Sequence, residues 1–334
     1  MDLNWKVIQR HNFTKLGPLA DFLELDETNR QHLLENPRFP LMLPRRLASK
    51  IKKNDLKDPI LLQFVPLKEE TLFSESFCSD PVQDKLFHKT STLLHKYSQR
   101  VLLVTTQACA MHCRYCFRQN FPYNKNEDYQ QDLEYIKNDP SILEVILSGG
   151  DPLSLSDTKL SQLILQLNNI DHVKIIRFHT RFLIGIPERI TEDFLNILRQ
   201  SSKQIIFVIH TNHPDELDKD VLESIKNIQA LKIPVLCQTV LLKEVNDDVT
   251  ILENLCWKLI QSGIIPYYLH QLDRVQGAMH FETKKEKGLQ LIEELRKRLP
   301  GYAVFRYVTE IPQKASKTPI LEMFTSFASN EAQG

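Results

Sequence analysis

The chain has 334 residues, of which 42% are hydrophobic, and its 42 basic side chains balance its 42 acidic ones. This composition can bury a large core, which excludes a disordered or fibrous protein. A net charge of zero argues against nucleic-acid binding, because nucleic-acid binders usually carry a basic excess. The first residues lack the apolar core of a signal peptide, and no apolar run approaches the roughly 20 residues of a membrane helix. We therefore expect a cytoplasmic protein with neither a nucleic-acid nor a membrane partner.

Residues 1–95 differ from the rest of the chain, because prolines break their helical pattern into short pieces. We predict a mostly helical N-terminal region that packs on the remainder of the molecule. The prolines that interrupt it are Pro37, Pro40, Pro44, Pro59, Pro66 and Pro81.

Residues 96–300 alternate short β-rich runs with longer amphipathic stretches, which is typical of βα units around a parallel sheet. Six such units predict the α/β class and an incomplete (β/α)6 barrel, similar to a TIM barrel left open on one side. A further β-rich run at 302–309 belongs to a C-terminal segment, 301–334. The predicted strands are 101–106, 144–147, 173–179, 204–210, 234–242 and 265–270. The predicted helices are 156–167, 193–199, 214–228, 248–260 and 284–299.

A cysteine motif directly follows the first predicted strand, and its residues are Cys109, Cys113 and Cys116. Three thiolates at this Cys-x3-Cys-x2-Cys spacing can bind three irons of a [4Fe–4S] cluster and leave the fourth iron open to an external ligand, which indicates catalysis. Two alternatives stay open: a zinc site that includes His112, and three ordinary buried thiols. Free thiolates suit a reducing compartment. The remaining cysteines, expected to be ordinary thiols, are Cys78, Cys237 and Cys256.

Two adjacent glycines follow the second predicted strand, in the segment Ser148-Gly149-Gly150-Asp151. Residues at the carboxyl ends of parallel barrel strands meet at the active face, so this segment should lie beside the cysteine motif. Glycine is scarce in this chain, with nine residues, and it allows backbone to approach a ligand closely or to adopt a positive φ. A tight turn is the alternative. Next to the cysteines, we favour ligand binding.

The cysteine spacing, with the aromatic Tyr115 before the third cysteine, resembles the signature of the radical S-adenosylmethionine (SAM) superfamily. Further segments together resemble one branch of it, the lysine 2,3-aminomutases. This resemblance implies a radical SAM barrel with three cofactors: the cluster, SAM at its open iron, and pyridoxal phosphate (PLP). Such an amine shift needs a radical generator, because ordinary acids and bases cannot remove hydrogen from an unactivated carbon. The matching segments are 95–97, 109–118, 148–151, 177–181, 210–214, 238–247, 267–273 and 316–319.

The same resemblance implies roles for single residues. Lys317 matches the lysine that forms a Schiff base with PLP, although 313–316 lacks the run of glycines that many family members have there. Arg100 matches an arginine that binds the PLP phosphate, and Arg118 one that binds the substrate carboxylate, and a planar guanidinium suits both tasks. Taken singly, each of these residues could be an ordinary surface charge. The other residues expected to bind a cofactor are Ser148, Gly149, Gly150, Asp151 and Gln238.

Two acidic residues, Asp273 and Glu310, match the pair that receives the ε-ammonium of lysine in this family, with Glu310 standing where the catabolic enzymes have Asp. Paired carboxylates favour a cationic tail and repel that of glutamate, so lysine is the expected substrate. Taken alone, Asp273 could equally cap a helix or form a salt bridge.

The segment 117–123 and the short stretch after Lys317 resemble the bacterial enzymes that prepare β-lysine for modification of elongation factor P. This implies conversion of (S)-α-lysine to (R)-β-lysine, an electron donor, and a functional link to elongation factor P and a lysyl-tRNA-synthetase-like ligase. A homodimer is a possible assembly. Two alternatives stay open: a catabolic lysine or glutamate 2,3-aminomutase, and an iron–sulfur or zinc protein that binds or transfers electrons without catalysis.

Overall fold

The computed structural model describes residues 4–123 and 128–320 of the chain. The predicted boundaries at residues 95 and 300 stay predictions. Of the predicted C-terminal segment 301–334, the part from 321 onward lies outside the described residues. Within the described part of the chain, no helix is both long enough and apolar enough to cross a membrane.

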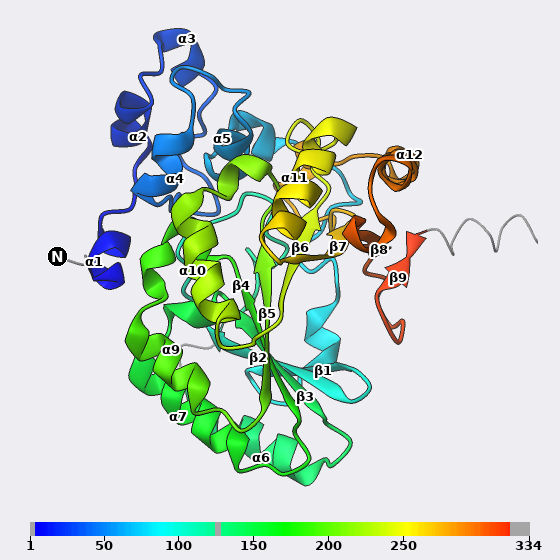
Figure 1. The fold of residues 1–334 in the computed structure, drawn as a ribbon. Coiled ribbons are helices and arrows are strands. Elements are labelled where there is room, and N and C mark those ends of the chain that lie inside the picture. The colour runs from blue at the N-terminus through cyan, green and yellow to red at the C-terminus, as the bar shows by residue number, and fades with distance from the viewer. Residues whose placement is uncertain (1–3, 124–127, 321–334) are drawn as a thin grey trace, which may run out of the picture.

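The N-terminal region consists of short helices joined by loops, and it lies at one end of the molecule (Figure 1). Pro44 and Pro59 stand at helix starts, where the missing N–H costs nothing. The Asp58 carboxylate caps the helix that begins at Pro59 by accepting backbone N–H groups. These helices are α1 (Trp5–Arg10), α2 (Leu16–Phe22), α3 (Glu27–Arg30), α4 (Arg45–Lys50) and α5 (Pro59–Phe64).

One open sheet of nine strands runs in chain order from β1 to β9 in the described residues. Strands β2 to β8 run parallel to one another, whereas the edge strand β1 pairs antiparallel with β2 and the edge strand β9 pairs antiparallel with β8. The predicted α/β class and incomplete barrel are confirmed, with β2 to β7 as its six strands. The edge strand β1 was not predicted. The strands are β1 (Leu93–Tyr97), β2 (Arg100–Thr106), β3 (Glu144–Gly149), β4 (Ile175–Thr180), β5 (Gln204–His210), β6 (Val235–Val240), β7 (Ile265–His270), β8 (Arg306–Thr309) and β9 (Thr318–Pro319).

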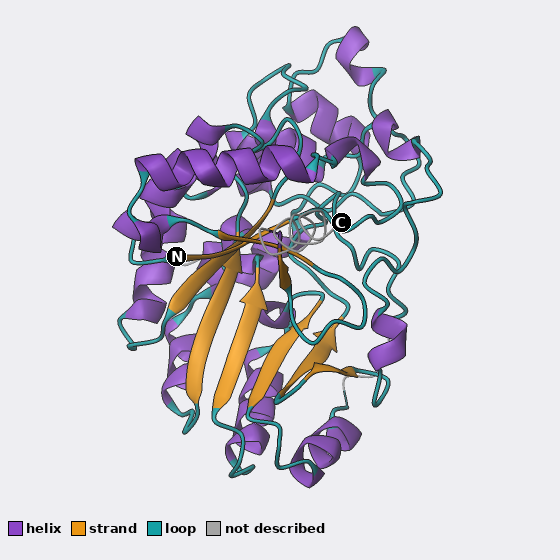
Figure 2. Cartoon of the chain, turned by 90° about the vertical axis from the view of Figure 1, so that its right-hand side faces the viewer, coloured by secondary structure: helices purple, strands orange, loops and turns teal. Residues whose placement is uncertain are grey.

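Helices connect the successive parallel strands and lie outside the sheet (Figures 1 and 2). Ser156, Thr191 and Asp248 cap three of them by accepting a backbone N–H group. The predicted helix 214–228 is instead a short 3-10 turn followed by α10, because Asp218 is extended and caps a new helix. The helices are α6 (Gln130–Asn138), α7 (Asp157–Asn168), α8 (Phe182–Gly185), α9 (Glu192–Arg199), α10 (Lys219–Gln229), α11 (Val249–Gln261) and α12 (Lys285–Arg298).

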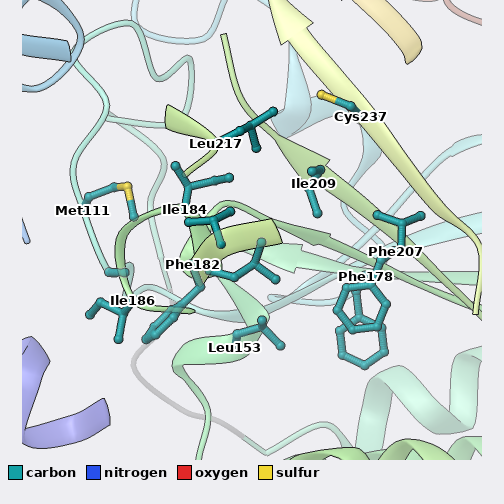
Figure 3. Close-up of a cluster of buried hydrophobic side chains, with 14 of the residues drawn as sticks. Met111, Leu153, Phe178, Phe182, Ile184, Ile186, Phe207, Ile209, Leu217 and Cys237 are labelled. Atoms are coloured by element: carbon teal, nitrogen blue, oxygen red, sulfur yellow. The ribbon is translucent and has the colours of Figure 1, made fainter. Parts of the chain in front are cut away.

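Part of the hydrophobic core supports the cysteine loop directly (Figure 3). Phe178 of β4 stacks on Phe207 of β5 with ring centroids 4.8 Å apart, and α8, which follows β4, is buried throughout. Met111, which lies between the first two motif cysteines, packs so closely on Gly185 that a Cβ there would lie 2.5 Å from its terminal methyl. Because such interiors are close-packed, this contact fixes the cysteine loop relative to α8.

Side chains connect the two edges of the open barrel. Lys96 and Tyr97 of β1 both contact Glu310, which directly follows β8. The two edges belong to strands that are far apart in the sequence, so Glu310 joins the beginning of the barrel to its end.

Candidate active site

A cavity of about 670 Å³ lies inside the barrel and extends to the cysteine loop. Apolar side chains of the strands, such as Leu102, Ile146 and Val208, form part of its wall. Every residue that the sequence assigned to a site contributes to the same wall. These residues are Arg100, Cys109, Cys113, Cys116, Arg118, Ser148, Gly149, Gly150, Asp151, Gln238, Asp273, Glu310 and Lys317. The structure therefore brings together segments from positions 100 to 317 in one concave site, as expected of a ligand-binding site.

The N-terminal region holds the backbone of the cysteine loop in place. Gln9 donates to the Cys109 carbonyl over 3.0 Å, and Asn12 donates to the Ala110 carbonyl over 2.7 Å. The carbonyl of Gln63 accepts the backbone N–H of Arg114 over 2.9 Å. Because these partners lie 50 or more positions upstream, the loop geometry depends on the first 65 residues of the chain.

The three motif cysteines lie in a poorly solvated environment. Burial raises the pKa of the Cys109 thiol well above its ordinary value, raises that of Cys113, and raises that of Cys116 to about 11. A bound cation would reverse this preference, because a metal binds the thiolate form. No three His, Cys, Asp or Glu side chains of the described residues surround one common metal-ion position. In a cluster site, each thiolate binds a different iron. The three cysteines therefore fit a cluster even though they do not surround one common metal-ion position.

His112 takes no part in this donor set. Its Nδ1 lies 2.8 Å from the carbonyl oxygen of Pro40, and its ring stacks on Phe39 at a centroid distance of 4.4 Å. His112 is not among the residues that line the cavity. Its side chain therefore anchors the loop to the N-terminal region.

The glycine segment packs against the cysteine loop. Gly149 has a φ of +116°, and a Cβ at Gly150 would lie 2.3 Å from the carbonyl oxygen of Ala108. Glycine is thus required at both positions by backbone conformation and by loop packing. The Asp151 carboxylate accepts the Thr180 hydroxyl over 2.8 Å and the Arg181 backbone N–H over 2.7 Å. These contacts give Asp151 a structural role, while its predicted role in cofactor binding stays a prediction.

A cluster of charged side chains occupies another part of the cavity wall. Glu310 accepts the Tyr97 hydroxyl at 2.7 Å from each carboxylate oxygen, pairs with Lys317 over 2.6 Å, and also pairs with Lys96. Burial alone would raise the pKa of Glu310, but the Lys317 ammonium and the hydrogen bonds from Lys317, Lys96 and Tyr97 lower it. Glu310 is therefore ionised and already holds ammonium groups.

Asp273 has a different environment in the same wall. Burial raises its pKa to about 6, although Lys317 opposes this shift, and the Glu310 carboxylate adds to it. A carboxyl with a raised pKa gains from the arrival of a cation, because the cation stabilises its ionised form. Asp273 can therefore accept a cation while Glu310 stays paired with Lys96 and Lys317.

The comparisons with known proteins agree with this geometry. A model of the Radical SAM superfamily matches residues 103–254. The L-lysine 2,3-aminomutase of Haemophilus influenzae is 39% identical and aligns over 94% of this chain and 95% of its own length. The L-lysine 2,3-aminomutase of Escherichia coli is 39% identical and aligns over 84% of this chain and 83% of its own length. That of Clostridium subterminale is 33% identical and aligns over 99% of this chain and 80% of its own length. The chain belongs to the L-lysine 2,3-aminomutase family.

Family membership confirms that the chain is a radical SAM enzyme, so the alternative of a non-catalytic iron–sulfur or zinc protein is wrong. It also confirms the predicted cluster and SAM, and PLP is the third cofactor expected of an aminomutase of this family. The three cysteines are the donor set that fits the cluster, while the assignment of each single site residue stays a prediction.

The cavity of this aminomutase also fits a phosphate-bearing cofactor. Among the described residues, Arg177 Nε and His179 Nε2 are buried without a hydrogen-bond partner, and both side chains line the cavity. Arg100 lies at the beginning of β2, with its guanidinium 4.7 Å from the centre of the Tyr97 ring. Tyr97 in turn contacts Glu310, so Arg100 lies near the Lys317 cluster. The Arg177 Nε–H group is an unsatisfied buried donor that requires a partner, and a phosphate oxygen can supply one.

Several residues of the aminomutase site received no role from the sequence. Asp84 accepts Arg118 Nε over 2.9 Å, in a contact that orients the predicted carboxylate-binding arginine. His179, His210 and His270 also line the cavity, and burial lowers their pKa values, that of His210 to about 3, so their rings are neutral. A signal for the histidines was present, because each is the last residue of a predicted strand. Asp84 begins a short 3-10 helix, Asp84–Phe87, and had no such signal.

Proposed function

We propose that this protein converts (S)-α-lysine to (R)-β-lysine with a [4Fe–4S] cluster, SAM and PLP. The supporting observation is that one cavity contains the three motif cysteines and, in another part of its wall, the Lys317, Glu310 and Asp273 side chains. The names and the 39% identity of the relatives agree with this activity. When bound, the cluster and SAM supply a carbon radical that can take hydrogen from an unactivated carbon, and PLP supplies an electron-delocalising partner for the migrating nitrogen.

The residues of the chain would bind and orient the substrate. Arg118, held by Asp84, would bind the carboxylate, and the two acidic residues would bind the ε-ammonium. Lys317 would have to lose a proton to a base or to solvent before its amine could act as a nucleophile, because an ammonium group has no lone pair, and the neutral amine would no longer form an ion pair with Glu310. Loss of this ion pair would free Glu310 Oε2 to accept another cation, and the ε-ammonium of lysine carries the required charge.

Anaerobic reconstitution with iron, sulfide, SAM, PLP and a reductant tests this function. We expect formation of β-lysine from lysine, detected by chromatography with a β-lysine standard, and no β-glutamate from glutamate. The Cys113→Ala variant should bind less iron and form no product, because two thiolates cannot hold the cluster with one open iron. Product from glutamate in place of lysine would support a glutamate 2,3-aminomutase and overturn the substrate assignment.

We further propose that the β-lysine is used to modify elongation factor P, through a lysyl-tRNA-synthetase-like ligase. The support is the similarity of the segment 117–123 to the enzymes of that pathway. Deletion of the gene should lower the mass of elongation factor P by one β-lysyl group, and the wild-type gene should restore it, whereas the Lys317→Ala variant should not. An unchanged mass after deletion would show that the product serves another purpose, such as lysine catabolism.

A further inference from the structure

Arg181 contacts the cysteine loop from the end of β4. It is 6% exposed, and its Nη1 lies 3.1 Å from the sulfur of Cys113. The same nitrogen donates to the hydroxyl of Tyr115, which lies between Cys113 and Cys116 in the loop. Arg181 is therefore a buried cation that faces both a predicted cluster ligand and the loop that carries it.

The position of the guanidinium is determined from several sides. Nη2 donates to Glu216 over 2.6 Å and to the amide oxygen of Gln63 over 2.7 Å. Asn212 donates to the same amide oxygen over 2.9 Å and to the Tyr115 hydroxyl over 2.7 Å. Glu216, Gln63 and Asn212 are each 0% exposed. Such a fully buried network is rigid, because any displaced member would leave an unsatisfied polar group.

The charges of this network act on Cys113 in opposite directions. Arg181 is in direct contact with the sulfur, whereas Glu216 lies behind Arg181 and contacts it through Nη2. Hydrogen bonds to cluster sulfurs and nearby positive charge stabilise the reduced, more negative cluster, and nearby negative charge does the reverse. In a buried site these interactions are little screened by solvent.

We propose that Arg181 is a positioning residue that raises the reduction potential of the cluster through its hydrogen bond to Cys113, and that Glu216 opposes it. This inference rests on the cluster that the proposed function places at the three cysteines. An external one-electron donor would thus reduce the cluster more easily than it would reduce the same cluster without Arg181.

The test is a redox titration of the reconstituted protein, followed by the electron paramagnetic resonance signal of the reduced cluster, without SAM or substrate. Glu216→Gln keeps the shape of the side chain and removes the negative charge, so the midpoint potential should become more positive. Arg181→Met combined with Glu216→Gln removes both charges without leaving a buried unpaired carboxylate, so the potential should become more negative than that of the wild type. The midpoint potential of Arg181→Lys should lie between those of the double variant and the wild type. The lysine keeps the positive charge but cannot reproduce the planar set of N–H donors of the guanidinium.

A second arginine–carboxylate pair provides the matched control. Arg189 is 0% exposed and pairs with Asp157 over 2.8 Å, but it does not line the cavity. Arg189→Met combined with Asp157→Asn should destabilise the protein in thermal unfolding and leave the potential unchanged.

The outcomes separate this inference from the proposed function. If the wild type assembles no cluster, the proposed function fails. If the wild type and the variants hold equal iron and have the same potential, or if the control pair shifts it equally, Arg181 has no electrostatic role. Should the double variant lose its cluster, Glu216→Gln and Arg181→Lys still decide, because their shifts are expected in opposite directions.

Discussion

The two functional parts of the cavity wall differ in how they are held and in what they carry. The cysteine loop presents three half-buried thiols, and residues of the N-terminal region such as Asn12 and Gln63 fix its backbone. The charged cluster around Glu310 combines lysines, carboxylates and Tyr97, and its members come from the two opposite edges of the sheet. One part depends on backbone geometry, and the other on a balance of charges.

This difference follows from the ligands that the two parts are proposed to bind. A metal cluster needs ligands at fixed positions. Because metal binding displaces the protons of the thiols, the protein can leave the thiols neutral until the metal binds. The ammonium group of a lysine substrate keeps its charge, so the site must supply carboxylates to bind it. The repulsion between these carboxylates has to be compensated when no substrate is bound. Lys96 and Lys317 provide that compensation at Glu310, whereas the raised pKa of Asp273 lets it take up a proton instead.

The largest effect is expected from Lys317→Ala, which removes the proposed nucleophile from the charged part and leaves the cysteine loop intact. Activity should fall to background, because no other amine would form the covalent link to PLP, while the iron content should stay at the wild-type level. Borohydride reduction followed by peptide mapping should place the PLP label on Lys317. Lys314→Ala is the matched control, since Lys314 is exposed and three positions away. A label on another lysine would refute the assignment.

A smaller loss is expected from Asp273→Asn, which keeps the side-chain shape and removes one of the two carboxylates. Loss of one partner from a buried ion pair costs a few kcal/mol, so kcat/KM for lysine should fall by about 100-fold or more. The iron content and the absorption spectrum of the cluster should not change. Steady-state kinetics with lysine checks the prediction, and a wild-type kcat/KM would show that Asp273 does not meet the ε-ammonium.

How far the sequence predicted this site depended on whether the signal was local. The cysteine spacing, the paired glycines and the ends of the parallel strands are local patterns, and they predicted that the glycine segment lies against the cysteine loop, where Gly150 packs on Ala108. Lys96 and Asp84 received no role, because their partners Glu310 and Arg118 are reached only through the fold. Arg181 lay within a matched segment, yet its contact with Cys113 follows from the packing of β4 against the cysteine loop.

The ionisation of Asp273 predicts a pH dependence that belongs to the charged part alone. Its pKa is raised to about 6 in the unliganded protein, so the carboxyl is neutral below that pH and ionised above it. Because kcat/KM reports the free enzyme, kcat/KM for lysine should fall by up to about tenfold per pH unit below pH 6. The contribution of this group to stability has the opposite sign: the folded protein holds the proton more tightly, so stability decreases as the pH rises from about 4 through about 6. The Asp273→Asn variant should lose this limb of the pH profile, and a limb that persists in the variant would have to come from another group.

The smallest effect is expected from Asn12→Ala, which tests whether the N-terminal region stabilises the cysteine loop. The change removes the hydrogen bond to the Ala110 carbonyl and should cost about 1 kcal/mol in the free energy of unfolding. A loosened loop should also release iron to a chelator faster than the wild type does. Asn4→Ala is the control, because Asn4 caps α1 through the Lys6 backbone N–H; it weakens the same region without touching the loop. Equal rates of iron release in the two variants would show that the N-terminal region contributes only to overall stability, whereas a faster release in Asn12→Ala alone would mean that the geometry of the cysteines depends on a hydrogen bond formed 98 residues upstream.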